Sequence, residues 1–402
     1  MKQYADPGTA SDPHYSFVVD GDGPFGYQAY VLSRSLMELA GVEPFRITAC
    51  VLEDAHPSIA ATLRSLGIGV ERVAPFGDPY CNKIQQLPKL VDVGASRVVL
   101  LDTDTFVLAK PDFPPGNAVL GKLVDAPNPP IATLVNIFAE AKLSLRPALS
   151  DVVPGPTVEG NFNGGLYVLP TANIPEIHAA WAHWARWCLA RPDLFADRVI
   201  NIDQVSFAMM IADIGLATEA LPRRFNTPTH LGPIANAEPP VMLHYHRSVD
   251  TQLLLLPVGD STLDAAIASA NRVIVGWRSA VLPNDLFWTA RYAQFPELGS
   301  GIGSRGTTLE RKRRMLSRIV QLFQPGSVVD IGGGDGMTIE GLTAGIHHAA
   351  TDAAPGAMRG YLARNPQATF SVADITAGPA PEPADLAVCL DLLIHLSTRD
   401  AY

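Results

Sequence analysis

The sequence predicts an α/β protein with two domains, each organised around an open sheet. Apolar strand-like runs and helical patterns alternate along the first hundred residues, which is typical of a mostly parallel sheet. Much later, the run 327–336 predicts a strand that ends in a glycine-rich turn and opens a helix. The chain has 402 residues, 47% hydrophobic and 17% charged, so it can form two folded domains with cores of their own.

Composition and charge exclude several classes of partner. The net charge is -10, from 30 basic and 40 acidic side chains, so we expect no nucleic-acid partner. Residues 1–14 form a polar tail without the basic and apolar regions of a signal peptide, and no apolar run is long enough to span a bilayer. Four scattered cysteines predict free thiols in a reducing compartment. We therefore expect a cytoplasmic protein.

The first elements continue the alternation. Residues 15–20 predict a strand, and a loop with three glycines and an aromatic-rich helix follow it. The loop lacks the glycine spacing and the ribose-binding acid of a dinucleotide site, so we reject a dinucleotide fold for this half. Two further strands, 47–52 and 70–74, flank a helix around 59–66.

The next strand, Arg97–Leu101, delivers two carboxylates at its end. The apolar run from Val98 predicts a strand covered on both faces, and Asp102 and Asp104 follow it. If the peptide turns at Thr103, both carboxylates can reach one hard cation, Mn²⁺ or Mg²⁺. The alternative is a solvated turn without a ligand.

Three later segments carry further polar candidates. Glycines around Asn163 allow a backbone to approach a ligand, and the alternative is a plain glycine bulge entering a strand. Asp203 and Gln204 begin a helix, where Asp203 also suits a capping role. An apolar strand from Val241 ends in His244 and His246. The tryptophans of the helix 177–190 are predicted to be core.

In order and spacing, these motifs resemble the GT-A glycosyltransferases, especially the glycogenin-like ones, over roughly the first 250 residues. The resemblance implies a metal-dependent, hexosyltransferase-like and retaining transfer from a nucleotide diphosphate sugar to a glycan acceptor. It implies metal ligands at Asp102, Asp104 and His244, with His246 as the alternate. The nucleotide, its phosphates and the donor sugar would then be contacted by Val19, Asp20, Tyr27, Lys83, Asn163, Asp203 and Gln204. Arg247 stands in the region where the family has a lysine-bearing loop.

The second half resembles the class I S-adenosylmethionine-dependent methyltransferases. Asp330, Gly332, Gly334 and Gly336 fit the glycine loop of that family. By the same resemblance, Asp352, 22 positions after Asp330, binds the ribose hydroxyls and Asp374 lies beside the adenine. A fourth strand, 386–391, follows, with His395 just beyond.

The expected fold is therefore α/β, with a GT-A type nucleotide-diphospho-sugar transferase domain followed by a partial Rossmann-like class I methyltransferase domain. We assign residues 15–255 to the first domain, 256–283 to a helical linker and 284–402 to the second. The sequence ends after the fourth strand expected of the methyltransferase sheet, so we expect sugar transfer but no methyl transfer. Two alternatives stay open: a nucleotide-binding module without transfer activity, and a methyltransferase with an amino-terminal scaffold domain.

Overall fold

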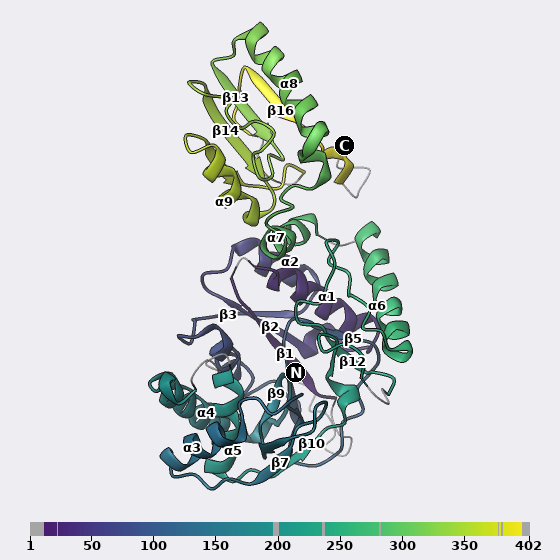
Figure 1. Ribbon diagram of the computed structural model, residues 1–402, viewed down its shortest axis with the longest axis vertical. Helices are drawn as coiled ribbons and strands as arrows, with labels where there is room; N and C mark the ends of the chain where they lie inside the picture. Colours follow the sequence, from purple (N-terminus) through teal and green to yellow (C-terminus); the bar gives the residue numbers. More distant parts are fainter. Residues whose placement is uncertain are drawn as a thin grey trace, which may run out of the picture. The chain divides into compact units, whose positions relative to one another are not determined.

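The computed structural model (Figure 1) describes residues 12–21, 23–195, 201–234, 238–280, 283–376, 378 and 381–395. Its internal contacts divide the chain into two compact units, the first mainly before residue 272 and the second mainly after it. Two short segments, 22–27 and 250–254, group with the second unit. Helix α6 (Ser261–Ala280) occupies most of the predicted linker, and the change between the units falls inside this helix.

The first unit is organised around a mixed seven-stranded sheet with the order β3-β2-β1-β4-β9-β6-β10. Strands β1 to β4 are parallel to one another, as the alternation predicted, whereas β9 runs antiparallel to both of its neighbours. All nine residues of β9 are buried, so its backbone lies in the middle of the unit. The strands are β1 (His14–Val19), β2 (Ile47–Leu52), β3 (Gly69–Val73), β4 (Arg97–Leu101), β6 (Val119–Leu123), β9 (Phe162–Pro170) and β10 (Thr218–Ala220).

Helices cover this sheet and supply most of its core. Trp181 and Trp184 are buried, as predicted, whereas Trp187 is only partly buried against the same core. Nε1 of Trp181 donates to Oγ of Ser206 at 3.1 Å. This bond ties α4 to α5. The helices of the unit are α1 (Phe25–Glu38), α2 (Pro57–Ser65), α3 (Ile131–Glu140), α4 (Ile174–Leu189), α5 (Ile202–Ile214) and the first part of α6. A 3-10 segment, η2 (Pro79–Lys89), lies between β3 and β4.

A small second sheet brings distant segments to the end of β4. Strand β12 (Met242–His244) runs antiparallel to β5 (Thr105–Val107) and parallel to β11 (Thr227–Pro228). Its register pairs His244 with Thr105, the residue directly after Asp104. The backbone N–H of Tyr245 also donates to the carbonyl of Asp104 at 3.0 Å. A separate hairpin joins β7 (Pro147–Leu149) and β8 (Pro156–Val158).

The second unit contains a parallel four-stranded sheet with the order β15-β14-β13-β16. The glycine-rich turn follows β13, as predicted, and Tyr361 lies fully buried in a small apolar core with Val328 and Val388. The strands are β13 (Ser327–Ile331), β14 (His347–Asp352), β15 (Thr369–Val372) and β16 (Leu386–Cys389). The helices are α7 (Asn284–Gln294), α8 (Gly306–Phe323) and α9 (Pro355–Arg364).

The predicted α/β class is thus confirmed in both units. Among the described helices, none combines the length and the apolar character that crossing a membrane requires.

Candidate functional site

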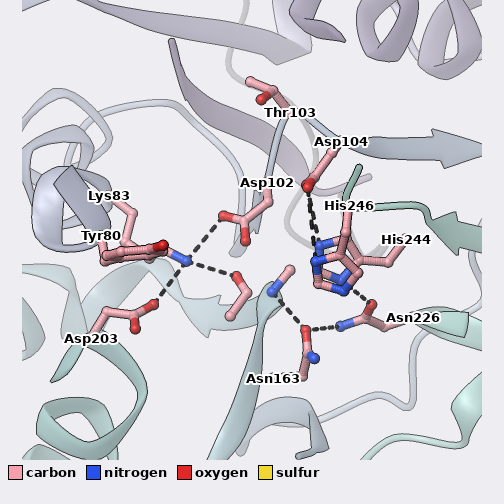
Figure 2. A network of polar contacts seen from close by, with 12 residues as sticks. Tyr80, Lys83, Asp102, Thr103, Asp104, Asn163, Asp203, Asn226, His244 and His246 are labelled. Atoms are coloured by element: carbon pink, nitrogen blue, oxygen red, sulfur yellow. Dashed lines mark hydrogen bonds and ion pairs between the residues drawn. The ribbon is translucent and has the colours of Figure 1, made fainter. Parts of the chain in front are cut away.

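The two carboxylates after β4 point to different neighbours. Oγ1 of Thr103 donates to Oε1 of Gln28 at 3.0 Å, and both side chains are buried, so the peptide between the aspartates is held in place. Figure 2 shows Asp102 directed towards Lys83 and Asp104 directed towards His244 and His246. The pair that was predicted to share one cation therefore contributes to two separate polar groups.

The first group is centred on Lys83, which η2 carries to the end of β4. Its Nζ lies 3.0 Å from Oδ1 of Asp102 and 3.1 Å from Oδ2 of Asp203, and it donates to the carbonyl of Gly164 at 3.1 Å. An ammonium group has three donors, and each has a partner here. Burial favours the neutral amine, but Asp102 and Asp203 outweigh it and raise the pKa of Lys83 well above its usual value. Lys83 is therefore a cation in which each of the three donors has a partner.

Asp203 enters this group from the first turn of α5. Its side chain is 3% exposed, and burial raises the pKa of Asp203 even though Lys83 opposes the shift. The second oxygen, Oδ1, is buried without a hydrogen-bond partner among the described residues. A buried acceptor without a donor is a place where a ligand hydroxyl can bind. Gln204, the other residue predicted here, is half-buried next to it.

The second group contains Asp104, His244 and His246. Oδ1 of Asp104 lies 3.1 Å from Nε2 of His244, and Oδ2 lies 4.0 Å from Nδ1 of His246. One potential ligand atom from each residue lies within 4.8 Å of the others. His246 has a left-handed φ of 50°, and this turn after β12 stacks its ring on that of His244 with centroids 3.9 Å apart. Both histidines thus join the group, whereas Asp102 lies outside it.

The charges in this group are divided unequally. Burial disfavours the ionised carboxyl, yet His244 and His246 lower the pKa of Asp104 to about 2. Burial also disfavours the imidazolium of His244, but Asp104 outweighs it and raises the pKa of His244. Burial, together with His244, lowers the pKa of His246 to about 2. Without a metal, Asp104 and His244 therefore form an ion pair, and His246 is neutral.

A row of buried amides connects His244 to the main sheet. Nδ1 of His244 lies 3.0 Å from Oδ1 of Asn226, and Nδ2 of Asn226 donates to Oδ1 of Asn163 at 3.1 Å. Nδ2 of Asn163 donates to Oδ2 of Asp125 at 2.8 Å, and Asp125 forms an ion pair with Lys122. Asn163, predicted to contact the sugar, is thus bonded to the side chains of Asp125 and Asn226, and Figure 2 shows its contact with Asn226. No sequence motif points to Lys122, Asp125 or Asn226, because they lie in irregular or strand segments.

The two glycines after Asn163 make room for both groups. A Cβ atom on Gly164 would lie 2.7 Å from Nζ of Lys83 and 3.0 Å from Oδ2 of Asp203. On Gly165 it would lie 2.4 Å from Nδ1 of His244. Small residues were expected here so that a backbone could approach a ligand. In the structure, the groups that approach this backbone are the protein's own polar side chains.

The residues predicted to lie beside the nucleotide are distributed over both units. Val19 is buried at the end of β1, and Asp20 accepts a 2.8 Å hydrogen bond from Nδ2 of Asn82. Burial raises the pKa of Asp20 to about 6, with the Asn82 bond opposing and the Asp102 charge adding to the shift. Tyr27 is buried and groups with the second unit, where its ring meets Phe287 edge-on. Arg247, the residue proposed in place of the family's lysine, is exposed in the turn after His246.

In the second unit, the predicted cofactor residues gather at the carboxyl ends of β13 and β14. Gly332, Gly334 and Gly336 have φ values of 70°, 56° and 74°, which favour glycine. Oδ2 of Asp352 accepts from the backbone N–H of Gly334 at 3.0 Å, and Oδ1 accepts from that of Ala354 at 2.9 Å. Asp352 thereby fastens the glycine loop to the end of β14.

Asp330 and Asp374 occupy different environments. Burial raises the pKa of Asp330 to about 7, although the hydroxyl of Tyr361 donates to it at 2.9 Å and opposes the shift. Asp374 is bonded within its own turn, where it accepts from Thr376. The ring of His395 lies edge-on to Trp288, with centroids 5.0 Å apart.

The glycine loop also has polar contacts that the sequence analysis missed. Oγ of Ser300 donates to Oδ1 of Asp335 and accepts from the backbone N–H of Asp335, at 3.0 and 2.9 Å. Arg305 forms an ion pair with the same carboxylate at 3.0 Å. The segment before α8 therefore packs directly on the loop.

Comparisons with known proteins give matches only at the level of structure. No family model and no curated protein matches the sequence. Among solved structures, the chain is similar to apo mouse xyloside xylosyltransferase 1, with 16% identity and a TM-score of 0.39, over 58% of this chain and 98% of that one. It is also similar to the apo bifunctional glycosyltransferase WbbM, with 13% identity and a TM-score of 0.36, over 67% of this chain and 53% of that one.

Proposed function

We propose that the first unit transfers a sugar from a nucleoside diphosphate sugar to an acceptor such as a glycan, with a divalent cation bound by Asp104, His244 and His246. The observation that carries the proposal is the proximity of these three donors at the end of β4, next to the Lys83 group. Ligands of open α/β sheets bind at the carboxyl ends of the strands. The GT-A type assignment rests on the sequence motifs together with this geometry.

The donor set fits a transition-metal dication better than Mg²⁺. Mg²⁺ prefers oxygen ligands in an octahedral shell, whereas imidazole nitrogen suits metals of the first transition row. Two imidazoles and one carboxylate therefore favour Mn²⁺ among the two cations expected from the sequence. Asp102 uses Oδ1 for Lys83, and its side chain is 34% exposed, so we keep it as a further candidate ligand through Oδ2.

The roles of the protein's own residues follow from their contacts. When bound, the cation would neutralise charge on the diphosphate leaving group. Asp203 offers its unpaired Oδ1 to a hydroxyl of the donor sugar, and Lys83 holds Asp203 and Asp102 in place. Asp20 and Asn82 form a polar pair at the end of β1 that suits a ribose or a base. Retention at the anomeric carbon remains part of the proposal.

For the second unit, we propose S-adenosylmethionine binding on the glycine loop after β13. The supporting observation is the combination of three left-handed glycines with Asp352 at the end of the adjacent strand. A carboxylate in that place suits the two hydroxyls of a ribose.

A ligand panel tests both parts. Thermal unfolding is measured with UDP, GDP, ADP and their hexose conjugates, each with and without Mn²⁺, and separately with S-adenosylhomocysteine. A ligand at 100 times its dissociation constant should stabilise the protein by about 2.7 kcal/mol. We expect one nucleotide series to stabilise only with Mn²⁺. If no nucleotide binds in either condition, the transferase proposal is wrong.

Nucleotide release then separates transfer from binding. A nucleotide-binding module would bind the conjugate but release no nucleoside diphosphate when a glycan is added. If only S-adenosylhomocysteine binds, the result favours the alternative of a methyltransferase with an amino-terminal scaffold domain.

A further inference from the structure

We propose that Asn226 and Asn163 are positioning residues that hold His244 in the tautomer with a proton on Nδ1, and so present Nε2 to the cation. The inference rests on the proposed function for the identity of the ligand. The orientation itself follows from the hydrogen bonds of the metal-free protein.

The orientation of the amides in this row is determined at the end farthest from His244, where Asn163 contacts Asp125. A carboxylate only accepts hydrogen bonds, so Nδ2 of Asn163 must be the group that donates to Asp125. Lys122 donates to the other oxygen of Asp125, Oδ1, in a buried ion pair. The backbone N–H of Gly165 donates to Oδ1 of Asn163 at 3.0 Å. These two contacts independently require the same orientation of the Asn163 amide.

The orientation of the Asn163 amide determines that of Asn226, which in turn determines the protonation of Nδ1 in His244. Because Oδ1 of Asn163 accepts, the atom of Asn226 that faces it at 3.1 Å must be the Nδ2 donor. Oδ1 of Asn226 then faces Nδ1 of His244 at 3.0 Å and can only accept. Nδ1 must therefore carry a proton. Nε2 faces Oδ1 of Asp104 at 3.1 Å, so the proton between these two atoms is the one that a cation would replace, while Nδ1 keeps its own.

Burial leaves few alternatives to this arrangement. His244 and Asn226 are each 2% exposed, and Asn163 is 8% exposed. Reversing either amide would place donor against donor or acceptor against acceptor in a region shielded from water, where unmatched polar groups are costly. Gly165 also allows no side chain beside the ring, so the imidazole packs directly on β9.

The row spans segments that lie far apart in the sequence. Lys122 is in β6, Asn163 in β9 and His244 in β12, and Asn226 precedes β11. The main sheet thus orients a ligand that belongs to the small sheet before any cation arrives. Partners of this kind fix the tautomer and direction of metal-binding histidines.

The first experiment measures the tautomer in the metal-free protein. Nitrogen-15 NMR of labelled histidines, with His244 identified by its loss in His244→Gln, reports which nitrogen is protonated once the ring is neutral. We expect a proton on Nδ1. A proton on Nε2 with none on Nδ1 would overturn the proposal, whatever the protein binds, because this experiment needs neither metal nor nucleotide.

The second experiment measures Mn²⁺ affinity by calorimetry in Asn226→Ala and in a matched control. Removing an orienting partner is expected to weaken Mn²⁺ binding by about 10- to 100-fold. The control is Asn161→Ala, which also removes a buried asparagine, one bonded to Thr157 outside the row. We expect wild-type affinity in the control. Equal affinity in Asn226→Ala and wild type would contradict a positioning role.

A third variant tests whether Asn226 acts by accepting a hydrogen bond from His244 or by donating one to Asn163. Asn226→Asp can accept from Nδ1 of His244 but cannot donate to Asn163, so a partial loss of Mn²⁺ affinity is expected. If Asn226→Ala does not fold, this variant and the wild-type tautomer still decide the proposal. A wild-type protein that binds no Mn²⁺ but has Nδ1 protonated would contradict the proposed function and leave the orientation supported.

Discussion

Nε2 of His244 lies 3.1 Å from Oδ1 of Asp104, so the two residues that we propose as metal ligands form an ion pair when no metal is bound. A proton occupies the place between the nitrogen and the carboxylate. A cation that binds both residues must displace this proton.

Mn²⁺ binding should therefore release a proton and strengthen as the pH rises. Burial lowers the pKa of His244, but Asp104 outweighs it and raises this pKa above its ordinary 6.5, so below the raised pKa the ring carries the proton that the cation must displace. While His244 is protonated, the apparent affinity should increase by about tenfold per pH unit. Calorimetry in buffers with different ionisation enthalpies measures the release. Binding without proton release at pH 6, below the ordinary pKa of 6.5, would place the cation elsewhere.

The same pair predicts how the stability of the metal-free protein depends on pH. The raised pKa of His244 gives a contribution that is fully present below about pH 6.5 and is lost as the pH rises through the folded pKa. The pKa of Asp104, lowered to about 2, gives a contribution that is present above its ordinary 3.8 and is lost towards pH 2. Urea unfolding across pH 5 to 9 should show the His244 contribution fade. His244→Gln should remove that pH dependence.

Substitutions should show that Asp104 contributes more to Mn²⁺ binding than Asp102 does. We expect Asp104→Asn and His244→Ala to weaken Mn²⁺ binding by more than about 100-fold, the upper end for loss of an orienting partner alone. His246→Ala should cost less, because its ring nitrogen lies 4.0 Å from Asp104. Asp102→Asn serves as the comparison, since Asp102 is bonded to Lys83. A larger loss in Asp102→Asn than in Asp104→Asn would reverse the assignment.

Removing the charge of Lys83 should destabilise the fold. Lys83→Met leaves Asp102 and Asp203 without their shared cation, and loss of one member of a buried ion pair typically costs about 3–5 kcal/mol. Chemical denaturation measures the change. Lys89→Met is the matched control, because Lys89 pairs with Glu71 on the surface, where such pairs contribute about 0–1 kcal/mol. If both variants lose the same free energy of unfolding, the contacts of Lys83 stabilise the fold no more than a surface ion pair does.

A methyl group on Gly165 should disturb the histidine. Its Cβ would lie 2.4 Å from the ring of His244, so Gly165→Ala must displace that ring and weaken Mn²⁺ binding. Gly276→Ala, in α6, is the control, since a Cβ there meets no atom within 4 Å and alanine favours the helix. Normal Mn²⁺ affinity in Gly165→Ala would argue that His244 is not a ligand.

In the second unit, Asp352→Ala should weaken binding of S-adenosylhomocysteine. The variant loses a carboxylate placed for the ribose and two bonds that hold the glycine loop. Hydrogen bonds to charged groups contribute about 1.5–3 kcal/mol, so a loss of about 10- to 100-fold is expected by calorimetry. Asp385→Ala is the control, because Asp385 holds the opposite end of β13 through Gly326 and Ser327. Equal losses would indicate a general effect on the fold.

Local patterns determined much of the architecture of this protein. The apolar run after Arg97 predicted β4 and placed Asp102 and Asp104 at its end, and the spacing of the tryptophans predicted the buried face of α4. The glycines after β13 predicted the turn that the structure has there. These inferences succeed because the spacing of apolar residues along a helix or strand, and the turn conformations that favour glycine, are local properties of the chain.

Only the tertiary structure decided how the site is divided. Asp102 and Asp104 are two residues apart, yet Lys83 from η2 holds one, and β12, paired with β5, brings His244 and His246 to the other. Asn226 gained its role by lying between β9 and β12 in space. The direction of a side chain at the end of a strand depends on which distant groups pair with it, and a local pattern contains no information about those partners.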